Sequence, residues 1–280
     1  MSDRRLFKRM VLGLPQNARD YAAVAAAADL AELLGIGLDG TFVEDAALLE
    51  VAGLPCVREL RPLEGWRPIS LTQLAREIEH AAATARRLFD EATRLCTVDT
   101  SFSLVRGAAA DVLVGQATAD DILVIVEPKN PGERVTRQFT ELLAAAFRAA
   151  AAVMIVPSRI ARVRGPVVTI AENPDDPSIS AALDIAAAAG ELLIAVPLNG
   201  FDSSKILTER AAAAGVRLKI ASALPRKFDQ PALVSNIGGL KPRLIIISRG
   251  TLDDAGDASL ASFCAVPVLV IEPDKAASTG

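Results

Sequence analysis

The chain has 280 residues, 51% of them hydrophobic and 23% charged, a composition that excludes intrinsic disorder and suggests two domains of ordinary size. The net charge of −4 gives no reason to expect binding to nucleic acid or to an anionic membrane. Three widely separated cysteines argue against a disulfide framework, and charges interrupt every apolar stretch before membrane-spanning length, so we expect a soluble cytoplasmic protein without a signal peptide.

The first half of the chain alternates apolar strand-like runs with helical patterns. The predicted strands are 9–14, 38–43, 101–106, 122–126 and 153–156, and the predicted helices are 18–34, 71–95, 109–118 and 134–150. Continuous apolar runs of this length are typical of strands that are buried on both faces of a parallel sheet. Strand, helix and strand in succession indicate right-handed parallel crossovers.

The segment 44–70 interrupts this alternation with three prolines, two glycines and the only tryptophan of the chain. We expect a long excursion with a short helix at 46–52. One interpretation is a surface flap that packs Leu54, Val57 and Trp66 onto the domain. The other is a lid or contact surface for a ligand or partner, because long irregular loops in compact domains are often functional. Since the excursion follows the end of a strand, we expect it to cover the ligand-binding edge of the first sheet.

After a short basic linker, 159–165, the same order of elements starts again. The predicted strands are 166–171, 191–196, 216–221, 243–248 and 266–271, and the predicted helices are 177–189, 203–214 and 231–240. The fold class is therefore α/β, with two open parallel-sheet, Rossmann-like domains in tandem. Their predicted bounds are 1–158, including the excursion, and 165–273 for a shortened second domain, with a tail at 274–280.

Two such halves resemble a tandem universal stress protein. The resemblance rests on two stretches, each similar to a characteristic stretch of that family: KRMVLGLPQNARDYAAVAAAADLAELLGIGLDGTFVED at 8–45 and AVPVLVIEP at 265–273. The resemblance implies that the last strands of the two domains lie side by side and antiparallel, as an intramolecular pseudo-dimer. We expect Met154 and Val268 near its pseudo-twofold axis. A further homodimer is left open.

Many members of that family bind ATP through G-x2-G-x9-G-[ST] after the fourth strand. Glycines let backbone N–H groups approach the phosphates there, and a helix N-terminus adds partial positive charge. In the first half the three glycine positions fall on Val126, Lys129 and Phe139, and only Thr140 matches the motif. The acidic residue with which the family contacts the nucleoside falls on Pro15. The resemblance therefore implies a degenerate ATP site in this half.

The second half departs from the motif in a different way. Its segment IISRG, 246–250, places Ser248 at the first glycine position, and 251–265 is too short for a phosphate loop and a full helix. Three carboxylates would repel a polyphosphate unless a cation intervened; they are Asp253, Asp254 and Asp257. Glu172, near the end of the first strand of this half, is a candidate for the nucleoside contact.

No catalytic set is evident, because His80 is the only histidine and no Cys/His cluster has metal-ligand spacing. The ligand-binding candidates are Glu127, Lys129, Gly132, Thr140, Glu172, Ser248, Arg249 and Gly250. We expect a non-enzymatic stress-response or regulatory protein that has no cofactor and acts by binding a protein partner or a small ligand. The alternative is a nucleotide-binding universal stress protein, taking ATP or AMP, with weak ATPase activity.

Overall fold

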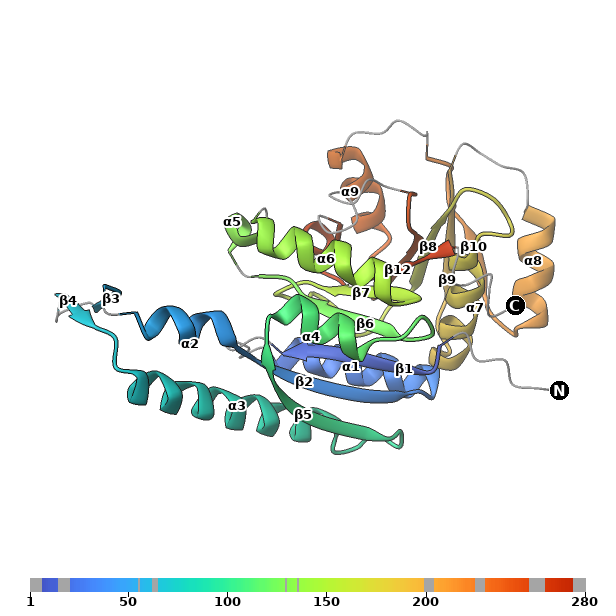
Figure 1. The fold of residues 1–280 in the computed structure, drawn as a ribbon. Coiled ribbons are helices and arrows are strands. Elements are labelled where there is room, and N and C mark those ends of the chain that lie inside the picture. The colour runs from blue at the N-terminus through green and yellow to red at the C-terminus, as the bar shows by residue number, and fades with distance from the viewer. Residues whose placement is uncertain are drawn as a thin grey trace.

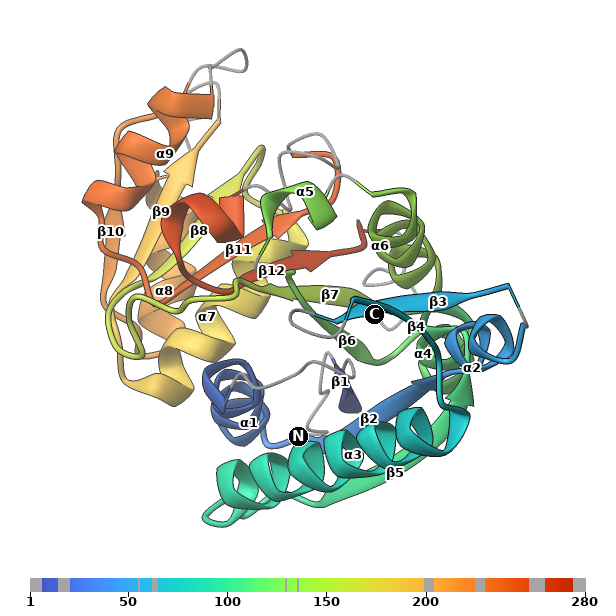
Figure 2. The same ribbon diagram turned by 90° about the vertical axis from the view of Figure 1, so that its left-hand side faces the viewer.

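A ten-stranded sheet with helices on both faces runs through the computed structural model of the chain (Figures 1 and 2). The structure describes residues 7–14, 21–54, 56–61, 65–128, 130–134, 136–198, 204–224, 230–251 and 260–273. Within these ranges, none of the helices combines the length and the apolar character that crossing a membrane would require. The predicted tail, 274–280, lies outside the described residues.

The first half of the chain supplies five strands of this sheet. They are β1 (Arg9–Leu14), β2 (Gly37–Asp45), β5 (Thr100–Gly107), β6 (Ile122–Val126) and β7 (Ala152–Val156). Its helices are α1 (Tyr21–Leu34), α2 (Ala46–Ala52), α3 (Leu71–Thr93), α4 (Ala109–Gln116), α5 (Pro131–Arg134) and α6 (Arg137–Ala149). The helix predicted at 134–150 begins three residues later, as α6, and the short helix α5 precedes it. Thr136 separates them, because its extended backbone and its hydroxyl, which accepts from the Phe139 N–H, begin α6 as an N-cap.

The second half supplies the other five strands and repeats the order of elements. Its strands are β8 (Val167–Ala171), β9 (Leu193–Pro197), β10 (Leu218–Ile220), β11 (Leu244–Ser248) and β12 (Val268–Ile271). Its helices are α7 (Pro177–Ala189), α8 (Ser204–Ala213) and α9 (Gln230–Gly239), and residues 260–264 form the described end of a further helix. Local sequence explains the bounds of α7, since the Asp176 carboxylate caps its start and Gly190 ends it with φ at 64°.

The strand order across the sheet is β10-β9-β8-β11-β12-β7-β6-β1-β2-β5. Each half therefore has the order third, second, first, fourth, fifth strand, and every pairing within a half is parallel. The two halves meet through β7 and β12, which pair antiparallel as predicted. The mostly parallel α/β fold is confirmed, and the central pairing joins the two expected sheets into one.

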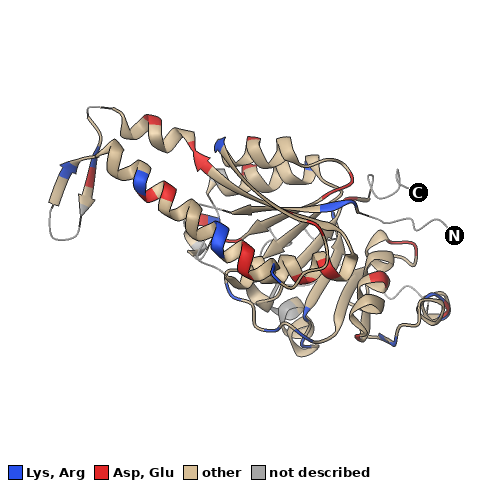
Figure 3. Cartoon of the chain, turned by 90° about the horizontal axis from the view of Figure 1, so that it is seen from below, with Lys and Arg blue, Asp and Glu red and all other residues tan. Residues whose placement is uncertain are grey.

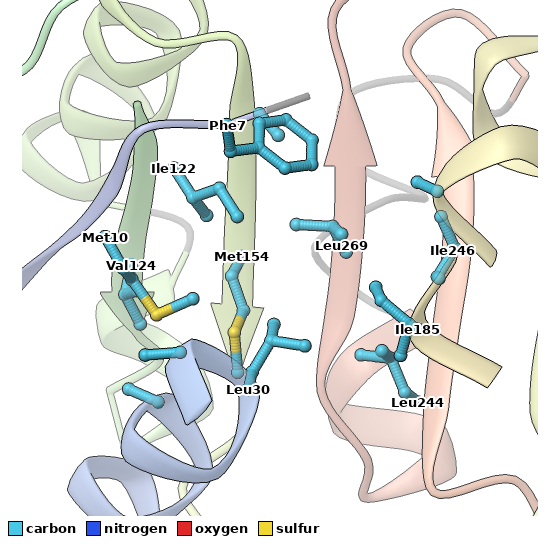
Figure 4. Close-up of a cluster of buried hydrophobic side chains, with 14 of the residues drawn as sticks. Phe7, Met10, Leu30, Ile122, Val124, Met154, Ile185, Leu244, Ile246 and Leu269 are labelled. Carbon is cyan, nitrogen blue, oxygen red and sulfur yellow. The ribbon is translucent and has the colours of Figure 1, made fainter. Parts of the chain in front are cut away.

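A pseudo-twofold axis relates the halves at this central pairing. The last pairs in register are Val126 with Val156 in the first half and Ser248 with Ile271 in the second, so Val126 is equivalent to Ser248. By the same register Met154 is equivalent to Leu269, and these two residues pair directly across β7 and β12. Figure 4 shows them on facing strands in the buried core. Met154 and Val268 therefore both lie near the axis as expected, with Val268 in the adjacent pair, opposite Ile155.

Two apolar layers hold the sheet between its helices. One face packs against α1, α3 and α7, and the other packs against α4, α6 and α9. Small residues allow close approach in the first layer: a Cβ placed on Gly40 of β2 would lie 2.6 Å from the Phe89 ring of α3. These layers leave the carboxyl ends of the parallel strands as the edge where functional residues can gather.

The excursion at 44–70 differs most from its prediction. Helix α2 begins and ends as expected, with Asp45 as its N-cap. It is followed by a two-stranded hairpin that was not predicted, β3 (Arg58–Arg61) and β4 (Gly65–Pro68). Each strand has only four residues, too few to display an alternating pattern. Helix α2, the hairpin and the start of α3, residues 46–71, form an arm that projects beyond the carboxyl ends of the strands (Figure 1).

The position of the arm distinguishes between the two interpretations of the excursion. The arm starts at the carboxyl end of β2, on the predicted side of the sheet. It extends away from the sheet in Figure 1, and the view from its own side draws β3 and β4 in front of β6 and β7 (Figure 2). The Trp66 side chain is 67% exposed and Leu54 is about half exposed, so the flap interpretation was wrong for these two residues.

Candidate functional site

The strand order places a switch point in each half of the sheet. From β8 the chain continues to β9 on one side, whereas β11 lies on its other side, and β1 has the same relation to β2 and β6. Ligands of open α/β sheets bind in the crevice that such a reversal creates at the carboxyl ends of the strands. The two candidate sites are therefore the β8/β11 crevice and the β1/β6 crevice.

Asp176 lies at the floor of the β8/β11 crevice and accepts most of the hydrogen bonds described there. Its buried carboxylate accepts a hydrogen bond from the Ser248 hydroxyl at 2.5 Å and another from the Ser178 N–H at 3.0 Å. Its second oxygen accepts from the Glu172 N–H at 3.3 Å. These bonds tie the end of β8, the start of α7 and the end of β11 to one carboxylate. A negative charge therefore already occupies the N-terminus of α7, where the helix dipole would favour a bound anion.

The polar groups behind Asp176 are also satisfied within the chain. The Ser178 hydroxyl lies 3.0 Å from the Thr169 hydroxyl, and both residues are fully buried. A phosphate group entering this crevice would have to displace hydrogen bonds that are already made and would meet a carboxylate. The arrangement favours a closed structural junction over an anion site.

Arg249, the next residue after β11, is directed toward the other half of the sheet. Its guanidinium donates to the Glu272 carboxylate at 2.9 Å and lies 4.8 Å from the centroid of the Phe147 ring of α6. A cation over an aromatic face is an attractive contact. The arginine predicted as a ligand contact thus takes part in the junction between the halves.

Glu172 and Gly250 are the predicted candidates that remain exposed at the β8/β11 crevice. Gly250 follows Arg249 with φ at 88°, a backbone conformation that residues other than glycine rarely adopt. Its turn leads into 252–259, which lie outside the described residues together with Asp253, Asp254 and Asp257. The rim of the crevice is therefore open to solvent, whereas its floor is closed by Asp176 and Ser248.

Glu127 stands at the end of β6, beside the β1/β6 crevice, and is only 2% exposed. One carboxylate oxygen accepts a hydrogen bond from the Ser262 hydroxyl of the second half. Ser262 in turn accepts from the Arg134 guanidinium at 2.5 Å. The other oxygen, Oε1, has no hydrogen-bond partner among the described residues. Burial raises the pKa of Glu127 above its usual value, and the hydrogen bond from Ser262 and the charge of Arg134 oppose that shift.

Glu127 and Arg249 occupy equivalent places in the two halves. Each directly follows the last residue of its fourth strand, and each N–H donates to the last residue of its fifth strand, Val156 or Ile271. Ser262 and Phe147 are equivalent in turn, because each lies nine residues before the end of its fifth strand. The junction therefore contains two equivalent contacts, related by the pseudo-twofold axis. In one, the Glu127 carboxylate contacts Ser262; in the other, the Arg249 guanidinium contacts Phe147.

The other predicted residues do not join either cluster. The Gly132 N–H donates to the side chain of Asn130 at 3.0 Å, and the exposed Thr140 hydroxyl donates to the Thr136 carbonyl at 3.2 Å on α6. Lys129 and Pro15 lie outside the described residues. Among the side chains that the structure describes, no three His, Cys, Asp or Glu residues come together as a possible metal site.

Sequence reasoning did not include Asp176, Ser262 or Phe147 among the candidate residues. Asp176 is a cap, but it also anchors Ser248, which is distant in the sequence. The signal available was its place between the first strand and the first helix of the second half, where a carboxylate can face the fourth strand. For Ser262 and Phe147 the available signal was the internal repeat, because the two residues occupy equivalent positions before the fifth strands of the two halves.

Comparisons with known proteins show the fold that surrounds these sites. A scan against protein-family models found no match, and a search of curated proteins found none either. Among solved structures, a universal stress protein from Archaeoglobus fulgidus DSM 4304 has a TM-score of 0.65 at 10% identity, covering 97% of this chain and 98% of its own. Protein PA1789 of Pseudomonas aeruginosa PAO1, functionally unknown, has a TM-score of 0.54 at 16% identity, covering 99% and 98%. The chain thus has the fold of universal stress proteins over nearly its whole length.

Proposed function

We propose that this chain is a tandem universal stress protein that has lost the ATP site of that family and acts without catalysis or cofactor. Its two domains, 1–158 and 165–273, form an intramolecular pseudo-dimer. In the cytoplasm it would serve a stress-response or regulatory role by binding a protein partner or a small ligand. The observation that carries the proposal is the hydrogen bond from Ser248 to the buried carboxylate of Asp176.

The positions of the family's glycine motif support this proposal. Val126 and Ser248, which the sheet register makes equivalent, both stand at the first glycine position, so neither half has glycine there. Phe139, at the third position of the first half, is buried in the core. A phosphate loop needs backbone N–H groups that a ligand can approach closely, and a buried phenyl ring at this position prevents that approach.

A nucleotide-binding protein with weak ATPase activity is the second candidate function. The exposure of Glu172 and Gly250 at the rim of the β8/β11 crevice favours it. A carboxylate at the end of the first strand of a half could accept from a nucleoside hydroxyl. In this case the phosphates would extend over the rim and would not enter the crevice.

Calorimetry with Mg-ATP and native mass spectrometry of the purified protein test the proposal. We expect little heat at millimolar nucleotide and no co-purified nucleotide. A dissociation constant in the low micromolar range, roughly −8 kcal/mol, would contradict the proposal and favour the second candidate.

A pair of variants tests the role of Asp176. Asp176→Asn removes the charge from the crevice but keeps an acceptor for Ser248, so we expect measurable, weak Mg-ATP binding to appear. Asp175→Asn changes an exposed neighbour and is the matched control, for which binding should stay as in the parent. Equal behaviour of the two variants would show that Asp176 is not what excludes phosphate.

A further inference from the structure

The arm at 46–71 is the part of the described chain that presents the most concentrated exposed apolar surface. Its six exposed large side chains are Leu48, Val51, Leu54, Leu60, Trp66 and Leu71. Leu60 and Trp66 are 62% and 67% exposed, and the other four are between 40% and 51% exposed. Single exposed apolar residues are normal, whereas six of them within one short projecting segment indicate an interaction surface.

The hairpin at the tip of the arm has one apolar face and one polar face. Leu60 pairs directly with Trp66 across β3 and β4, so the two side chains share a face. The adjacent pair, Glu59 and Arg67, points to the opposite face, where its atoms form an ion pair at 2.7 Å. Arg67 also donates to Gln73 of α3 at 3.1 Å. The polar face is therefore tied to α3, and the Leu60–Trp66 face is turned away from it.

This hairpin lacks the support that a small sheet needs. No third strand joins β3 and β4 within the described part of the chain. An isolated two-stranded hairpin is marginally stable in water, and added strands or a packed face are required to hold it. The exposed Leu60–Trp66 pair is where such packing could be added.

We propose that the arm is a contact surface for a second copy of this chain, with the apolar faces of two arms packed across a twofold axis. Self-association fits the charge of the arm, because residues 46–71 contain three arginines and three glutamates and therefore carry no net charge. Figure 3 shows basic and acidic residues interspersed along the hairpin and α3. A surface of balanced charge can meet a copy of itself, which is what an isologous dimer requires.

The apolar area exposed along the whole arm is of the order that such a dimer needs. Trp66 offers about 150 Å², and each of the five aliphatic side chains offers about 50 Å². Their sum of about 400 Å² is close to the roughly 450 Å² of non-polar surface that one partner contributes to an interface of standard size. This inference does not depend on the proposed loss of the ATP site, because the arm and the β8/β11 crevice are tested by separate variants.

Sedimentation equilibrium over a range of concentrations, read together with tryptophan fluorescence, tests the arm. The chain has a mass of 29.3 kDa, so we expect twice that mass for the parent protein. Leu60→Glu places a charge in the apolar face and should raise the dissociation constant at least about tenfold. Trp66 is the only tryptophan, so its emission should move to longer wavelength on dilution of the parent and stay there in Leu60→Glu.

Leu95→Glu is the matched control. Leu95 is 84% exposed and lies just beyond the other end of α3, a helix about 35 Å long, so this variant should associate as the parent does. A parent that is monomeric at every concentration would overturn the proposal. So would a Leu60→Glu variant that dimerises as tightly as the parent, because the dimer would then use another surface.

Discussion

Glu127 offers a test of how the two halves are held together. The buried carboxylate is 2% exposed, and its Oε1 has no hydrogen-bond partner among the described residues. Its pKa is raised above the ordinary value of 4.5, chiefly by burial. The folded state therefore holds this proton more tightly than the unfolded state does. The stability that the protonated group contributes is fully present below about pH 4.5 and is lost as the pH rises through the folded pKa.

Glu127→Gln removes the charge and keeps an oxygen that can accept from Ser262. A buried polar group without a partner costs about 1–3 kcal/mol, and more when it is charged. Because the new amide group still finds no partner at the Oε1 position, we expect only part of this cost to be recovered. The variant should gain about 1 kcal/mol in free energy of unfolding at pH 7. That corresponds to about 2–4 °C in melting temperature for a chain of this size.

Thermal and urea unfolding between pH 4 and pH 8 measures this difference. The gain should vanish toward pH 4, where Glu127 of the parent protein is itself protonated. Glu79→Gln, on the exposed side of α3, is the control and should change little at any pH. If Glu127→Gln is less stable than the parent at pH 7, or if the difference does not vary with pH, the reasoning about the buried charge is wrong.

Two further substitutions examine the core. Met154→Asp places a charge without a partner at the pseudo-twofold axis, so we expect a large loss of stability and new proteolytic cleavage within 159–164. The control, Met154→Leu, keeps the side-chain volume and should cost less than about 1.5 kcal/mol of stability. Cleavage as slow as in the parent would contradict the role of this contact. Gly40→Ala should lose about 1–3 kcal/mol in denaturant unfolding because the new Cβ meets Phe89 at 2.6 Å. Gly115→Ala, on α4 with open space around it, should gain about 0.5–1 kcal/mol, and equal effects of the two glycine variants would refute the packing argument.

The sequence alone was sufficient for most of the sheet and for its pairing at the centre. Runs such as 122–126 are apolar throughout because both faces of a parallel strand are buried, and this local pattern located the strands to within two residues at each end. Helices α2 and α7 were predicted with their observed bounds, since Asp45 and Asp176 are caps that act over two or three residues. The antiparallel pairing of β7 with β12 followed from the family resemblance, and the register of that pairing followed only from the structure.

Tertiary structure alone decided what the candidate residues do. Glu127 and Ser262 are 135 residues apart, and Asp176 and Ser248 are 72 apart, so no local pattern could show that they are bonded. Glu127 was predicted as a ligand contact because it lies at the carboxyl end of a strand. Ser248 and Arg249 were predicted because their segment resembles the start of the family's glycine motif. The structure engages all three in contacts within the chain. The β7–β12 pairing brings Glu127 and Arg249 against the last helix of the other half, whereas Ser248 donates to Asp176 within its own half. The hairpin of the arm could not be predicted from the sequence either. Strands of four residues are too short to show an alternating hydrophobic pattern, and the exposed Leu60–Trp66 pair is not part of a buried apolar run.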